Sequence, residues 1–580
     1  MAGMIIVDFR VGKFEIHCPA HTAGVAKGLP SHRWLPSKMA WSAPLCRLNV
    51  DYIESVMIPA GHTITPAARL AIDDFRRSMA RLSVKKPFPP GYKFKTEPMP
   101  HQALGLEFSY GQLISAFFAD MGCGKTKLAI DKISAQFVAG IVDAVVVVVP
   151  ASIRLNWVQE LDTHCPIENS PFVVESGKEK QFQEWASQGR VFPWLVVGVE
   201  SLQGGRAAGL VQNFTDTHPK FAMIIDESSR IKNHKALRSR ACVEIGKKAI
   251  SKIVMTGTPL SQGPEDLYMQ FEFLDPDIIG LPDFYSFRQR YCVLGGFKNK
   301  KIIGYKNMEE LTASVNPYVF QVRKKDVLKD IPPKVYQRRV LSMAPDQLKM
   351  YRQIVKDEKY EHEGKEQTVS GSLEKMLRLQ EVVGGFFSYR VPNPNYDGSP
   401  KSKPFNILKE RLAGGNPKIT ELLHIIEESG LAQVIIWCVY KEEIRMVCEA
   451  LRQRYGDDQV VEIHGDIDQK QRHEDLYGKF QTGRARFLVG NPASGAMGLN
   501  MTAAELVVYY SNSFKFEDRE QSEDRAHRKG QTKQVTYIDL VMEKSVDLVV
   551  AKALARKMDV SEFVRQSLGV EELFQPEAGQ

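Results

Sequence analysis

The stretch that decides the fold is ADMGCGKT, residues 119–126. It follows an apolar run at 113–118, which is typical of a strand, and it precedes a helical pattern at 127–136. A strand, a glycine loop and a helix that opens on Gly-Lys-Thr predict a P-loop, whose backbone N–H groups hold phosphate oxygens. Lys125 is expected to reach the β- and γ-phosphates, and Thr126 is expected to ligate Mg²⁺. The predicted phosphate-contacting residues are Met121, Gly122, Cys123, Gly124, Lys125 and Thr126.

A pair of acids supplies the second chemical element. The apolar run 221–225 ends in Asp226 and Glu227. Beside a P-loop, Asp226 is predicted to hold Mg²⁺, directly or through water, and Glu227 to polarise the attacking water. Together these elements predict an ATP hydrolase with ATP and Mg²⁺ as its cofactors.

Short apolar runs alternate with helical stretches in two series along the chain. Such runs are typical of parallel strands with helices on both faces of the sheet. We therefore predict an α/β fold with two tandem parallel-sheet lobes and a small N-terminal α+β domain, which opens with a hairpin. The expected parts are an accessory domain at 1–84, a linker at 85–100, lobe 1 at 101–334, a helical connector at 335–414, lobe 2 at 415–560 and a tail at 561–580.

Composition excludes several classes of protein. The 580 residues include 77 Lys and Arg and 69 Asp and Glu, a net charge of +8 that suits a polyanionic partner but is shared by many enzymes. The eight cysteines form no CxxC pair, which argues against structural zinc or a disulfide scaffold and favours a reducing compartment. The most apolar stretch, 144–149, is too short to cross a bilayer, so we expect a cytoplasmic protein without a membrane partner.

The motifs of the first series resemble those of the Swi/Snf-like branch of superfamily-two helicases, the double-stranded-DNA translocases. The P-loop has Ala119 where the strict pattern has Gly, which is the relaxed form of helicase-type ATPases. Ser228 and Ser229 stand where the family has Ala and His. The similar segments are VVVVVPASIRLNWVQEL (145–161, motif Ia), VES (199–201, the Ib region), DESSRIKN (226–233), MTGTPL (255–260, motif III), and VRKKDV (322–327) with IPPK (331–334), the brace before lobe 2.

The second series carries the rest of the resemblance. VIIW (434–437) is similar to motif IV, and HGD (464–466) with Arg472 to the element that follows it. NPASGAMGLN (491–500) resembles motif V. QSEDRAHRKGQ (521–531) closely matches motif VI and is the most specific string in the chain.

This resemblance implies two RecA-like lobes that share an ATP site. Gln102 stands where the family reads adenine, and Gly498 and Gln521 belong to the expected nucleotide site. Arg525 and Arg528 are expected one turn apart on one face of a helix, from which they reach the γ-phosphate as arginine fingers when the lobes close. The resemblance also implies tracking along duplex DNA, with contacts chiefly to phosphate from motifs Ia, IV and V and from residues 199–201.

The N-terminal 84 residues place Trp34 and Trp41 among Arg33, Lys38 and Arg47. Aromatic side chains interleaved with basic ones are typical of nucleic-acid surfaces, so forked or branched DNA is a candidate partner. The alternative is an ordinary core whose basic side chains extend to the surface. No chromatin-reading segment is recognisable, so the chain resembles a minimal bacterial or viral version, expected in a bacterial or phage-infected cell.

Three functions remain open at this point. The first is an ATP-dependent double-stranded-DNA translocase that remodels branched or protein-bound DNA, and the form of motif VI favours it. The second is a strand-separating DNA or RNA helicase. The third is a nucleotide-gated DNA-binding clamp with little turnover, against which the intact Lys125, Asp226 and Glu227 argue. The sequence carries no signal for protein partners.

Overall fold

The chain divides into two compact units, Met1–Val327 and Leu328–Gln580. The computed structural model describes residues 4–82, 84, 88–89, 91–260, 263–295, 301–327, 331–357, 359–362, 365–368, 372–396, 405–495, 500–528 and 530–556. Within these ranges no helix combines the length and the apolar content that a membrane crossing requires. The tail at 561–580 lies outside the described residues.

The first unit opens with a small mixed sheet. The predicted hairpin is confirmed, because β1 (Ile6–Arg10) pairs antiparallel with β2 (Lys13–His17). Its spatial order is β3 (Arg33–Leu35), β4 (Ala40–Pro44), β2, β1 and β5 (Thr63–Ile64). The helices of this segment are α1 (Ala23–Lys27), α2 (Arg47–Tyr52) and α3 (Pro66–Leu82).

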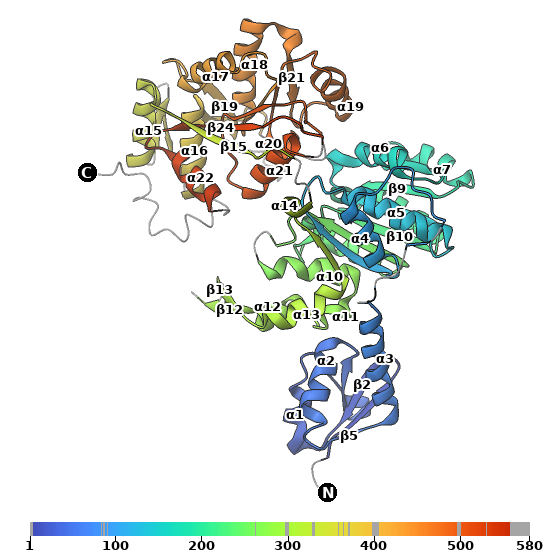
Figure 1. Ribbon diagram of the computed structural model, residues 1–580. Coiled ribbons are helices and arrows are strands. Elements are labelled where there is room, and N and C mark those ends of the chain that lie inside the picture. Colours follow the sequence, from blue (N-terminus) through green and yellow to red (C-terminus); the bar gives the residue numbers. More distant parts are fainter. Residues whose placement is uncertain are drawn as a thin grey trace. The chain divides into compact units, whose positions relative to one another are not determined.

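The first unit contains a second, larger sheet, whose strands are all parallel (Figure 1). In spatial order its strands are β14 (Val319–Val322), β6 (Ile114–Ala119), β11 (Ser251–Thr256), β10 (Phe221–Asp226), β7 (Ala144–Val149), β9 (Pro193–Gly198) and β8 (Ser170–Val173). Every residue of β7, β9 and β10 is buried, as expected for strands with helices on both faces of their sheet. The strands that carry the P-loop and the paired acids, β6 and β10, both neighbour β11, so their carboxyl ends meet at one edge.

Helices connect these strands. They are α4 (Pro100–Ser109), α5 (Lys125–Val138), α6 (Arg154–His164), α7 (Glu179–Ser187), α8 (Arg206–Thr217), α9 (Leu237–Gly246), α10 (Tyr268–Leu274), α11 (Pro276–Ile279), α12 (Phe284–Tyr291), α13 (Met308–Val315) and α14 (Lys324–Val327). An antiparallel pair, β12 (Cys292–Gly295) and β13 (Lys301–Tyr305), follows α12.

A segment before α4 packs across α5. Tyr92 donates its hydroxyl hydrogen to Asp131 at 3.2 Å, and the Thr96 carbonyl accepts from Lys127 at 2.7 Å. Lys127 also forms a buried ion pair with Asp131 at 2.7 Å and lies 5.3 Å from the centre of the Phe94 ring. This cover explains why α5 is buried from Lys127 to Gln136, although a helix on one face of a sheet normally exposes its outer side.

The second unit contains its own parallel sheet. Its order is β15 (Val335–Leu341), β24 (Thr536–Met542), β23 (Leu506–Tyr509), β20 (Val434–Trp437), β22 (Phe487–Gly490) and β21 (Val460–Ile463). The helices are α15 (Pro345–Asp357), α16 (Ser372–Gly384), α17 (Pro417–Glu428), α18 (Lys441–Tyr455), α19 (Gln469–His473), α20 (Pro492–Gly495), α21 (Phe516–Ala526) and α22 (Val546–Ala555). The predicted class, two α/β parallel-sheet lobes, is confirmed.

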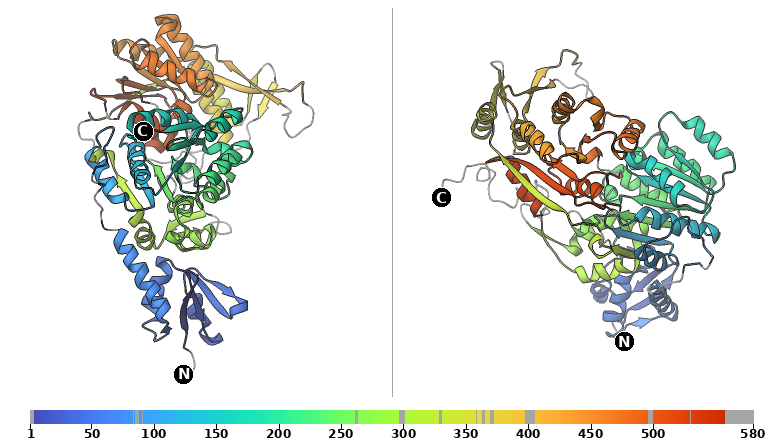
Figure 2. Two further views of the ribbon diagram at one scale, coloured as in Figure 1. Left: turned by 90° about the vertical axis from the view of Figure 1, so that its right-hand side faces the viewer. Right: turned by 45° about the horizontal axis from the view of Figure 1, so that its top comes forward.

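Two antiparallel hairpins of the second unit have no counterpart in the sequence predictions. One pairs β16 (Lys359–His362) with β17 (Lys365–Thr368), and the other pairs β18 (Phe386–Pro392) with β19 (Phe405–Arg411). All of β19 is exposed, and the second hairpin, drawn in yellow in Figure 2, extends away from the sheet of its own unit. Both hairpins lie within 335–414, where the sequence predicts only a helical connector.

Candidate functional site

The P-loop joins β6 to α5, where the sequence predicts it. Gly122 and Gly124 have φ angles of +83° and +73°, a left-handed conformation that residues with a Cβ rarely adopt. Gly124 is the N-cap of α5, so the loop ends at the positive end of the helix dipole. Backbone N–H groups in this geometry bind phosphate.

Lys125 is the first residue of α5, and its side chain turns back toward the strand. Its Nζ donates to the Ala119 carbonyl at 2.6 Å and to the Asp120 carbonyl at 3.4 Å. Both acceptors are uncharged oxygens. The ammonium group therefore carries a charge that an anionic phosphate would neutralise, as the predicted role of Lys125 requires.

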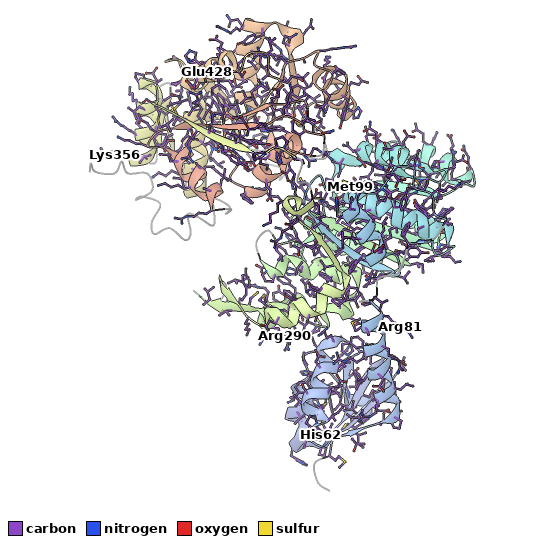
Figure 3. The ribbon with its side chains drawn as sticks, viewed as in Figure 1. His62, Arg81, Met99, Arg290, Lys356 and Glu428 are labelled. Atoms are coloured by element: carbon purple, nitrogen blue, oxygen red, sulfur yellow. The ribbon has the colours of Figure 1, made fainter. Side chains whose placement is uncertain are left out.

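Two side chains of helix α4 form hydrogen bonds to the backbone of the P-loop. Gln102 Nε2 donates to the Gly124 carbonyl at 3.0 Å. Its Oε1 accepts from the backbone N–H of Met99 at 2.8 Å. Met99 is labelled in Figure 3. His101 Nε2 donates to the Cys123 carbonyl at 2.9 Å. A Cβ at Gly124 would lie 2.1 Å from Gln102 Nε2, so the close approach of this amide also requires glycine. The amide of Gln102 thus supports the loop, and its role in reading adenine stays a prediction.

Asp226 ends β10 and is only 9% exposed. Its Oδ1 accepts from the backbone N–H of Glu227 at 2.9 Å, and its Oδ2 accepts from the indole Nε1 of Trp157 at 2.9 Å. Burial raises the pKa of this carboxyl, while the Trp157 hydrogen bond and the charge of Lys125 act in the opposite direction. Lys125 and Asp226 are therefore close enough for the ammonium charge to favour the ionised carboxylate.

Glu227 adopts a left-handed conformation with a φ of +49°. Residues other than glycine rarely hold this conformation, and such strain is concentrated at functional sites. The turn directs the chain from β10 into the short helix Ser228–Ile231. Glu227 therefore lies at the edge of the sheet, next to the buried Asp226, as the predicted pairing of a metal ligand with a general base requires.

Ser228 connects the acid pair to motif III. Its hydroxyl donates to Gln270 Oε1 at 2.6 Å, and both side chains are fully buried. Gln270 Nε2 donates to the carbonyls of Pro259, in motif III, and Asp266, at 3.3 and 2.9 Å. Where the family has Ala and His after the acid pair, this chain thus has a serine hydroxyl that reaches motif III through a glutamine amide.

Motif VI lies on α21 in the second unit. Gln521 is buried and donates to Glu517 at 3.1 Å, and Arg525 is 7% exposed. Lys334 of the brace segment bonds to Glu523 at 2.9 Å and to Asp524 at 3.1 Å. Burial lowers the pKa of Lys334, but these two carboxylates outweigh it and raise that pKa above its ordinary value. The brace therefore fixes the helix turn that carries Arg525.

The prediction that Arg525 and Arg528 share one helical face is wrong. Helix α21 ends at Ala526, and His527 leaves the helical conformation with φ −99° and ψ 80°. The imidazole Nε2 of His527 donates to the Pro332 carbonyl at 2.8 Å, which holds the chain in the turn that follows. Arg528 lies in that turn and is half-buried. Its role as an arginine finger stays a prediction, as does that of Arg525. Gly498, the other predicted nucleotide-site residue of the second unit, lies outside the described residues.

The residues present fit ATP and Mg²⁺. Two left-handed glycines, a helix N-terminus and an ammonium group that donates to two backbone carbonyls form a phosphate cradle around Lys125. Mg²⁺ in nucleotide sites takes one or two protein oxygens together with phosphate and water, so Thr126 and Asp226 suffice as protein ligands. In the ranges that the structure describes, no group of three His, Cys, Asp or Glu residues forms a separate metal site.

Sequence reasoning missed three residues of this site. Trp157, Gln270 and Lys334 each bond to a predicted motif residue from a distant part of the chain. Trp157 and Lys334 lie inside segments that the sequence had singled out, motif Ia and the brace. A polar residue in the apolar helix pattern MQFEFL, next to motif III, was the available signal for Gln270.

Two family models match the chain. The SNF2-related domain matches residues 101–384, and the helicase conserved C-terminal domain matches residues 417–530. The first match contains the P-loop, the acid pair and motif III, and the second contains motifs IV and V and all of motif VI except Gln531.

Curated relatives resemble the chain at low identity. "DNA annealing helicase and endonuclease ZRANB3" of Mus musculus is 25% identical over 479 residues, which cover 81% of this chain and 41% of that protein. "ISWI chromatin-remodeling complex ATPase ISW1" of Saccharomyces cerevisiae is 24% identical, covering 78% of this chain and 39% of that protein. The chain spans less than half the length of either relative. A solved "Sulfolobus solfataricus SWI2/SNF2 ATPase core in complex with dsDNA" is 21% identical, with a TM-score of 0.38, over 84% of this chain and 98% of that one.

Proposed function

Since the chain belongs to the SWI2/SNF2 family of superfamily-two helicases, we propose that it is a DNA-dependent ATP hydrolase that translocates along double-stranded DNA. One observation carries the proposal. Strand β6, which leads into the P-loop, and strand β10, which ends at Asp226, both neighbour β11 in a parallel sheet, so the phosphate cradle and the acid pair lie at one edge of that sheet. Motif VI supplies arginines from the second unit, which makes hydrolysis depend on the approach of the two units.

The proposed roles of the site residues follow from the negative charge of the ATP phosphates. The transferred phosphoryl group carries negative charge that must be neutralised in the transition state. Lys125 and the N–H groups of the P-loop bind the phosphates, and Thr126 and Asp226 hold Mg²⁺, which when bound neutralises further charge. Glu227 orients the attacking water, and Arg525 and Arg528 complete the site.

DNA contacts are proposed on both units, chiefly to phosphate and therefore independent of sequence. The N-terminal sheet offers a surface for forked or branched DNA. Trp34 is 38% exposed, its ring centre lies 5.0 Å from that of Trp41, and Lys27 lies 5.7 Å from the Trp41 ring. Exposed aromatic rings beside basic groups stack on unpaired bases. The free thiols of all eight cysteines, which lie within the described residues, support work in a reducing, intracellular compartment.

A triplex-displacement assay tests translocation. With ATP, the protein is expected to displace a third strand from duplex DNA and to leave a simple tailed duplex intact. Glu227→Gln, which should bind ATP without hydrolysing it, is the control. Separation of the tailed duplex without triplex displacement would favour the strand-separating alternative. Neither activity, together with little ATP turnover, would favour a nucleotide-gated clamp.

Salt dependence tests the mode of DNA binding. If phosphate contacts dominate, DNA-stimulated turnover should fall steeply between about 50 and 200 mM salt, because counterions return to the DNA. Turnover that does not respond to salt would argue against a phosphate-tracking enzyme.

Trp34→Ala tests the branched-DNA surface. Binding to forked DNA should weaken by about tenfold, since stacking of one base on an aromatic ring contributes about 1–3 kcal/mol. Binding to linear duplex should stay unchanged. Met39→Ala is the matched control, because Met39 is 71% exposed in the connection between β3 and β4 and offers no ring. Equal affinity of the two variants for forked DNA would indicate that Trp34 has only a structural role.

A further inference from the structure

The indole of Trp157 makes a specific contact in the nucleotide site. Trp157 is 1% exposed, and its Nε1 donates to Asp226 Oδ2 at 2.9 Å. The other oxygen of Asp226 accepts from the Glu227 backbone N–H at 2.9 Å. Each carboxylate oxygen thus has one protein donor, a side-chain N–H on Oδ2 and a backbone N–H on Oδ1.

Helix α6 presents the indole from a fixed position. Arg154, the first residue of α6, donates from Nη1 to the Val174 carbonyl at 2.7 Å and from Nε to the Ala151 carbonyl at 3.0 Å. These bonds tie the start of the helix to the segment that follows β8 and to the loop after β7. A donor held this firmly can select one rotamer of the carboxylate, which a mobile donor cannot.

We propose that Trp157 is a positioning residue, whose indole N–H orients Asp226 to bind Mg²⁺ in the nucleotide site. The inference rests on the proposed function, because Asp226 is a metal ligand only in an ATP site. Partners that orient a metal ligand commonly change metal affinity by about 10- to 100-fold when they are removed. Loss of the N–H should therefore weaken metal binding while the phosphate cradle stays intact.

Two substitutions separate the hydrogen bond from the packing of the ring. Trp157→Phe keeps an apolar ring and loses the donor. Trp157→His loses ring volume but keeps an N–H, because the imidazole Nε2 corresponds to the indole Nε1 in the five-membered ring. A purely structural role predicts that the smaller histidine is the worse replacement, whereas positioning of Asp226 predicts that phenylalanine is worse.

Trp194 offers a matched control in the same unit. It is fully buried in β9, and its Nε1 has no hydrogen-bond partner among the described residues. Trp194→Phe and Trp194→His therefore remove the same atoms from a similar environment without touching Asp226. Thermal unfolding of all four variants measures the cost to packing separately.

Metal affinity is read directly by electron paramagnetic resonance of Mn²⁺, with a non-hydrolysable ATP analogue bound to the full chain. Trp157→Phe should weaken Mn²⁺ binding by about tenfold, with Trp157→His closer to wild type and both Trp194 variants unchanged. Affinity for the analogue in excess EDTA should be equal in all. Wild-type Mn²⁺ affinity in Trp157→Phe, or a larger loss in Trp157→His, would overturn the inference. Absence of nucleotide-dependent Mn²⁺ binding in the wild type would instead refute the proposed function.

Discussion

Replacing Lys132 with methionine is expected to stabilise the nucleotide-binding sheet of the first unit, and to do so more at pH 6 than at pH 8.5. Lys132 lies in the middle of α5 and is fully buried. Its Nζ donates to Ser115 Oγ at 2.7 Å, and the ring of Phe117 lies 5.9 Å away. Burial lowers the pKa of Lys132 from 10.5 to about 7. This fall corresponds to at most about 5 kcal/mol of unfavourable free energy for the charged form.

Proton linkage determines whether the stability of the folded protein rises or falls with pH. The folded pKa lies below the unfolded one, so between about pH 7 and 10.5 the unfolded chain binds the extra proton and stability rises with pH. Below pH 7 the full penalty is present. Methionine removes the penalty at the cost of one hydrogen bond to Ser115, about 1 kcal/mol. The gain should therefore be about 2–4 kcal/mol at pH 6 and about 2 kcal/mol smaller at pH 8.5.

Hydrogen exchange of peptides from α5, corrected for intrinsic exchange rates, reports this local stability. Lys127→Met is the contrasting control on the same helix. Lys127 is also buried but is paired with Asp131 at 2.7 Å, so its loss leaves a buried carboxylate and should destabilise. Equal protection of Lys132→Met and wild type at pH 6, or a gain that does not depend on pH, would refute the reasoning.

Three further outcomes are expected. Lys125→Ala should abolish ATP turnover in a steady-state assay, because it removes the P-loop cation that is proposed to neutralise the β- and γ-phosphates; wild-type turnover would exclude the P-loop assignment. Arg525→Ala or Arg528→Ala should lower kcat by about 10³-fold while fluorescent-nucleotide binding to the protein persists; loss of binding without loss of turnover would contradict the finger role. Gln270→Leu leaves the Ser228 hydroxyl buried without its acceptor, at a cost of about 1–3 kcal/mol, and should lower kcat more than ATP affinity; a change in affinity alone would exclude a link between the acid pair and motif III.

The features that could be predicted from the sequence are those whose signal lies within a short run of consecutive residues. Phosphate binding needs a strand, a glycine turn and a helix N-terminus in direct succession, so residues 119–126 identify the P-loop without any knowledge of distant partners. The same holds for β7 and β10, whose continuous apolar runs indicate strands buried on both faces. The two parallel-sheet lobes and the candidate ATP residues follow from such short-range signals.

Only the tertiary structure decided which residues act together. The order β6, β11, β10, β7 brings Trp157, which follows β7, to Asp226 at the end of β10, although they are 69 positions apart along the chain. The bond from His527 to the Pro332 carbonyl accompanies the end of α21 at Ala526, where the local sequence predicted a helix that continued to Arg528. Helix and strand signals come from neighbours along the chain, whereas the partner of a buried N–H or carboxylate depends on which elements the sheet places side by side. The chemistry could thus be read from the sequence, but the groups that orient it could not.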